Sequence, residues 1–116
     1  MIDYIGIKME PKEVGDKEVA QFKICCIDTV RNELFALKQK VSHDAIENPQ
    51  FDTVGYVTET AKILLESYCA HNHENITVEE WEELYKKIKP DIERCAEEWR
   101  KGNKNILFND LWRNTN

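Results

Sequence analysis

The chain has 116 residues, a net charge of −6 at neutral pH and an isoelectric point of about 5.1. This length predicts one domain, residues 1–116, with a core that needs no disulfides. The acidic balance argues against non-specific binding to nucleic acid, and no apolar run reaches the ~18 residues of a membrane span.

Residues 1–12 lack the basic start and the apolar run of a signal peptide. We therefore expect a cytoplasmic protein, in which the four cysteines stay reduced. Within this segment Ile5, Ile7 and Met9 alternate with polar residues or glycine, which is the period of a strand. No partner strand is predicted elsewhere in the chain. The segment is expected to lie extended across helices or to pair with its own copy in a dimer.

The next segment is predicted to form one long helix over Asp16–Glu47. Asp16 is a good N-cap residue, and Asn48 before Pro49 ends the helix. Apolar residues recur at steps of three and four, which is helical spacing. This stripe consists of Val19, Phe22, Cys26, Val30, Leu34, Leu37 and Val41.

Two further helices are predicted over Asp52–His71 and Thr77–Lys101. The second of them begins with a capping box, in which Thr77 and Glu80 each bond the other's backbone amide. Its apolar stripe stays in phase across Pro90, which predicts a helix that is either kinked or split there.

A short last helix is predicted over Asn109–Arg113. The predicted fold is therefore all-α: an up-down-up antiparallel bundle of three long helices plus a short C-terminal helix. Four residues of the stripes are expected in its core, namely Val30, Leu34, Leu64 and Leu84.

One cluster has the residue types of a metal site: Cys69, His71 and His73, with His43 as a fourth ligand from another helix. Cysteine and histidine are common zinc ligands, but the sequence lacks a second cysteine or histidine pair at the spacing found in zinc fingers. We expect no metal and no cofactor, and take the cluster as a polar helix end. The adjacent residues 42–44, Ser-His-Asp, are no indication of a catalytic triad, because triads are assembled from separate chain regions.

Three helices are expected to leave some apolar and aromatic residues uncovered, and the interface candidates are Phe22, Phe35, Leu37, Trp81, Trp99 and Trp112. No residues form a recognisable catalytic arrangement. The expected function is therefore non-enzymatic binding of another protein or self-association as a homodimer, without nucleic acid or membrane partners. Two alternatives stay open: a small metal-binding protein using the cluster above, and a nucleic-acid regulator whose basic first helix contacts phosphate.

Overall fold

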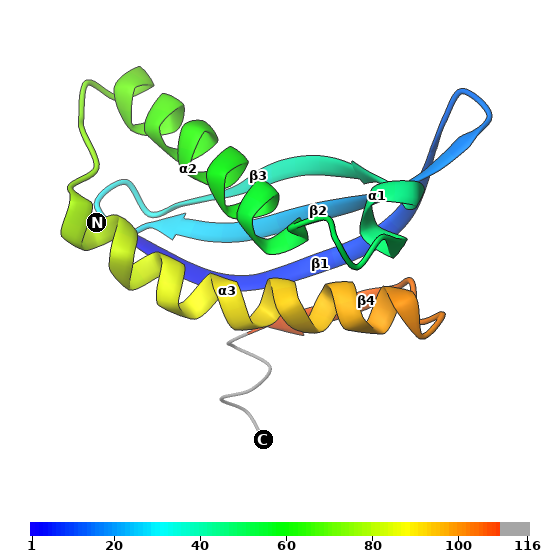
Figure 1. The fold of residues 1–116 in the computed structure, drawn as a ribbon. Helices are drawn as coiled ribbons and strands as arrows, with labels where there is room; N and C mark the ends of the chain where they lie inside the picture. The colour runs from blue at the N-terminus through cyan, green and yellow to red at the C-terminus, as the bar shows by residue number, and fades with distance from the viewer. Residues whose placement is uncertain (110–116) are drawn as a thin grey trace.

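The computed structural model describes residues 1–109 and contains a four-stranded antiparallel sheet beside three helices (Figure 1). The predicted all-α bundle is therefore wrong. The strands are β1 (Ile2–Val14), β2 (Lys17–Asp28), β3 (Glu33–Ser42) and β4 (Ile106–Asn109), in the sheet order β3-β2-β1-β4. The helices are α1 (His43–Glu47), α2 (Thr53–His71) and α3 (Val78–Arg100).

The predicted helix over Asp16–Glu47 is replaced by β2, β3 and α1. Asp16 is not an N-cap but lies in the tight turn between β1 and β2, after Gly15 with a φ of +66°. A glycine with positive φ at the first central position suits a type II′ hairpin, whose twist matches that of the strands. The pairing Val14↔Lys17 closes this turn.

The strand predicted from Ile5, Ile7 and Met9 is confirmed within β1, which finds its partners inside the chain. It pairs with β2 on one side and with β4 on the other. A bulge at Ile5 shifts the register between Tyr4 and Gly6. Because side chains alternate between the two faces, the bulge lets Tyr4 and Ile7 both point into the core despite their odd separation.

Helices α2 and α3 cover one face of the sheet, with α2 over β3 and α3 over β1 and β4 (Figure 1). The inward side chains of the strands and the apolar faces of these helices form one buried cluster. Its largest fully buried members are Trp99, Phe22, Ile7 and Met9. Within residues 1–109, no helix is long and apolar enough to cross a membrane.

The two helices predicted over Asp52–His71 and Thr77–Lys101 are confirmed as α2 and α3. Helix α3 runs through Pro90 without a break, so the alternative of two separate helices is wrong. Asp91, the next residue, is buried and accepts a hydrogen bond of 2.6 Å from the hydroxyl of Tyr4. The short helix predicted over Asn109–Arg113 is not found at Asn109, which ends β4, and otherwise lies outside the described residues.

Two of the four predicted core residues lie near the core, and two do not. Leu84 is buried and Leu64 packs against the core from its edge. Val30 and Leu34 are about 70% exposed, because Val30 lies in the turn after β2 and Leu34 points away from the helices.

The capping box of α3 is present as predicted: the Glu80 amide donates to the Thr77 hydroxyl at 3.1 Å, and the Thr77 amide donates back to Glu80 at 3.3 Å. We expect Thr77→Ala to lower the free energy of unfolding by about 1 kcal/mol in urea titration. Thr60→Ala is the matched control, since the Thr60 hydroxyl bonds only the Tyr56 carbonyl of its own helix. Equal losses in the two variants would contradict the capping role.

Candidate functional site

A partly apolar groove lies between β3 and α2, beside the edge of the sheet. Its volume is about 600 Å³, and its floor includes Phe35 and Leu37 from β3 and Leu64 and Tyr68 from α2. Strand β3 is an edge strand, because within residues 1–109 only β2 pairs with it. The groove therefore adjoins a row of backbone donors and acceptors that have no strand beside them.

The alternation of β3 decides which of its side chains face the helices beside this groove. Phe35, Leu37 and Val41 point toward the helices and are buried or half-buried. Ala36 and Lys38 point to the opposite face and are exposed. An added strand could therefore pair with the backbone of β3 and place every second side chain between β3 and α2.

One end of the groove is fixed by stacked rings. Phe35 and Tyr68 lie nearly parallel, with ring centroids 3.9 Å apart and an interplanar angle of 10°. The hydroxyl of Tyr68 donates to Asp28 at 3.1 Å, which links α2 to the end of β2.

Asp28 is the centre of a hydrogen-bond network at the same end. Its carboxylate accepts from the backbone amides of Val30 and Arg31 and, at 2.8 Å, from the Arg31 guanidinium. Arg31 also donates to Glu74, at 2.5 Å, in the loop after α2. This network holds the β2–β3 turn against the α2–α3 loop.

The network shifts the pKa values of Asp28 and of the partly buried Tyr68. Hydrogen bonds from Arg31, above all from its guanidinium, lower the pKa of Asp28 to about 2. Burial, together with the hydrogen bond to Asp28, raises the pKa of Tyr68 to about 12. Asp28 is therefore charged and Tyr68 protonated at neutral pH, as the donor and acceptor geometry requires.

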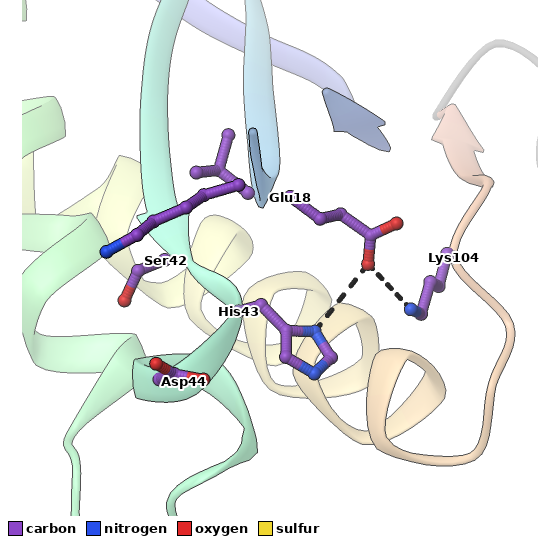
Figure 2. Close-up of a pocket in the computed structure, with 7 residues that line it drawn as sticks. Glu18, Ser42, His43, Asp44 and Lys104 are labelled. Carbon is purple, nitrogen blue, oxygen red and sulfur yellow. Dashed lines mark hydrogen bonds and ion pairs between the residues drawn. The ribbon is translucent and has the colours of Figure 1, made fainter. Parts of the chain in front are cut away.

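A second hollow, of about 630 Å³, is bordered by several charged side chains and lies where β2, α1 and the loop before β4 meet (Figure 2). The Glu18 carboxylate lies 2.7 Å from Lys104 Nζ and 3.6 Å from His43 Nδ1. Figure 2 shows Ser42 and Asp44 apart from the His43 ring. Ser42 is the N-cap of α1, where its hydroxyl accepts from the Ala45 amide, so no triad is formed.

The four metal-ligand candidates are not brought together. His43 begins α1, near the start of α2, whereas Cys69 and His71 lie at the end of α2. A 19-residue helix is about 28 Å long, so His43 is far from the others. Cys69 is buried, while His71 and His73 are exposed. In the described part of the chain no group of three or more such side chains could hold a metal ion.

The six interface candidates have separate locations. Phe22, Leu37 and Trp99 are buried in the core, where fewer than 5% of their surfaces are exposed. Trp81 is half-buried and contacts Tyr85. Phe35 and Leu37 line the groove along β3. Trp112 lies outside the described residues.

The helical interpretation of residues 16–47 does not predict this groove, because the groove requires β3 to be a strand. The signal that could have located it is the period-two alternation of Phe35, Leu37 and Val41 with Ala36, Lys38 and Lys40. This alternation gives an edge strand with one apolar face.

Comparisons with known proteins do not add to this geometry. No family model matches the chain, and neither a curated protein nor a solved structure matches it.

Proposed function

We propose that the protein acts by binding protein through the edge of β3, and that the bound strand is β3 of a second copy. The observation that carries this proposal is the edge of a ten-residue strand, which no strand of residues 1–109 pairs with, beside a partly apolar groove. Antiparallel pairing of β3 with its copy would join two four-stranded sheets into one of eight strands. Such a two-fold contact is the commonest kind in homo-oligomers.

Residue chemistry selects one register for this pairing. In a continuous sheet, paired residues point to the same face, so a residue of β3 can pair only with a residue an even number of positions away. The two-fold axis then lies between the two copies of one residue of β3, and not between two peptide bonds. With the axis at Ala36, Phe35 pairs with Leu37 and Glu33 with Gln39 on the helix side. On the open side Leu34 pairs with Lys38, whose stem can cover it.

The neighbouring registers fit less well. With the axis at Leu37, Glu33 would face Val41, a buried apolar side chain. With the axis at Lys38, two lysines would be directly opposite each other, which is destabilising. The amide of Gln39 also favours the Ala36 register: it is buried and lacks a hydrogen-bond partner among the described residues, and this register places a polar residue opposite it.

The position of Ala36 at the axis gives a test by charge. Ala36 is exposed, so lysine or glutamate at this position should not disturb the fold. In an Ala36→Lys or an Ala36→Glu homodimer, two like charges would be directly opposite each other. We expect both variants to be monomers of about 13.7 kDa in sedimentation at concentrations where the unchanged protein is a dimer. Mixing the two variants should restore the dimer, because their charges are opposite.

Leu107→Lys is the matched control, because Leu107 is an exposed position in β4, the other edge strand of the described sheet. This substitution should leave the dimer intact. A monomeric unchanged protein at high micromolar concentration would refute self-association. If Ala36→Glu stayed dimeric while Ala36→Lys did not, the axis would lie at Leu37, where Ala36 faces Lys38.

A further inference from the structure

The sheet face turned away from the helices carries a concentration of positive charge. Several lysines of β1, β2 and β3 point to this side, which we call the open face; among them are Lys8, Lys12, Lys23, Lys38 and Lys40. Four of them border a shallow hollow of about 490 Å³ together with Gln21 and Gln39. This concentration is found in a protein whose net charge is −6.

The arrangement of these lysines is costly for the free protein. Lys23 is paired directly with Lys8 on one side and with Lys38 on the other, so three ammonium groups form a row across three strands. Like charges at directly paired positions destabilise a sheet. The row therefore opposes folding, and a bound anion would relieve the repulsion.

Among residues 1–109, the carboxylate that pairs with these lysines and compensates for part of their charge is that of Glu10. Glu10 lies 2.9 Å from Lys23 Nζ and 3.4 Å from Lys8 Nζ. Neither Lys38 nor Lys40 has an ion pair with any residue of 1–109. The open face thus has more positive charge than its own acid can balance.

We propose that the open face binds an acidic, extended segment of another protein. Alternate side chains of an extended chain repeat at about 6.7 Å, which is also the spacing of Lys38 and Lys40 along β3. Carboxylates at every second position of the segment would therefore match the lysines along a strand.

Other features of the structure disfavour nucleic acid and membranes as the occupant. Single-stranded nucleic acid is held by aromatic rings that stack on its bases, and none of the aromatic residues of 1–109 lies on the open face. Helix α3 carries eight acidic and five basic side chains, so the helical side of the molecule is repelled by an anionic membrane surface, which extends beyond the open face.

The test uses the full chain and fluorescently labelled poly-L-glutamate. We expect binding in low salt that weakens markedly at physiological ionic strength, where exposed charges are screened. Replacing Lys23 and Lys38 together by glutamine should weaken the binding about tenfold, as expected for two lost surface ion pairs. The matched control replaces Lys86 and Lys87, two exposed lysines of α3, by glutamine and should bind as the unchanged protein does.

A stability measurement separates binding from a structural role. Lys38→Gln removes one of the repelling charges, so its melting temperature should equal or exceed that of the unchanged protein while its binding weakens. A lower melting temperature would mean that Lys38 supports the fold instead. The mass of each variant in solution reports separately whether β3 still pairs with its copy.

Three results would overturn the proposal. They are failure to bind poly-L-glutamate in low salt, unchanged binding by the doubly substituted variant, and equal or tighter binding of single-stranded RNA or of phosphatidylserine vesicles. The last result would assign the open face to phosphate rather than to acidic protein.

Discussion

Phe22→Ala should lower the free energy of unfolding by about 3–5 kcal/mol in urea titration. Phe22 is fully buried on β2, a central strand, between β1 and β3 and beneath the helices. Its removal loses the transfer free energy of the ring and leaves a cavity that the surrounding strands cannot close. Such a loss is a large part of the 5–15 kcal/mol that stabilises a typical domain.

Leu34→Ala is the comparison that distinguishes the observed fold from the bundle predicted from sequence. The bundle places Leu34 in the core, with a cost of roughly 2–5 kcal/mol. In the structure its side chain is 69% exposed on the open face, so we expect a change within about 0.5 kcal/mol for dilute protein. A large loss for Leu34→Ala and a small one for Phe22→Ala would mean that the sheet is wrong.

Asp28 should make the protein sensitive to acid over a defined range of pH. Its pKa is lowered in the folded state from 3.8 to about 2, so the folded state binds a proton less readily than the unfolded chain. The stabilisation is therefore complete above the unfolded value of 3.8 and is lost as the pH falls through about 2. Chemical denaturation at several pH values across this range measures the loss.

Asp28→Asn is the variant that isolates this effect. It should be less stable than the unchanged protein at neutral pH, because the Arg31 guanidinium loses its buried counter-charge. The difference between the two proteins should shrink as the pH falls toward 2. A difference that stays constant with pH would show that the Asp28 carboxylate contributes nothing through its ionisation.

The C-terminal half of the fold could be predicted from sequence, and the reasons are local. Thr77 and Glu80 form the capping box, and the apolar residues of α3 keep a helical period from Leu84 to Trp99. These signals depend on residues close together in the chain. The same is true of Ile7 and Met9, whose alternation correctly predicted a strand.

The region from residue 17 to 42 was mistaken for a helix because one of its strands is apolar on both faces. In β2, Phe22, Ile24 and Cys26 point inward, but Cys25 and Ile27 on the opposite face are also non-polar. The alternation is thereby hidden, and a subset of residues can be read at helical spacing. Only pairing with distant strands decides between the two structures, and that pairing is not a local property.

The candidate site was predicted only in fragments for the same reason. Phe35 and Leu37 were named as interface candidates, but the groove that they line also includes Leu64 and Tyr68 from α2. The cationic row of the open face was equally hidden, because Lys8, Lys23 and Lys38 become neighbours only through strand register. A helix over residues 16–47 gives no reason to group these three lysines.

The place of β4 in the sheet has a consequence for synthesis on the ribosome. β1 is made first, yet one of its two neighbours, β4, begins only at Ile106. Until that residue leaves the ribosome, part of the edge of β1 around Ile7 and Met9 has no partner strand. Nascent chains and truncations that end before Ile106 should therefore aggregate or recruit chaperones more readily than the full chain.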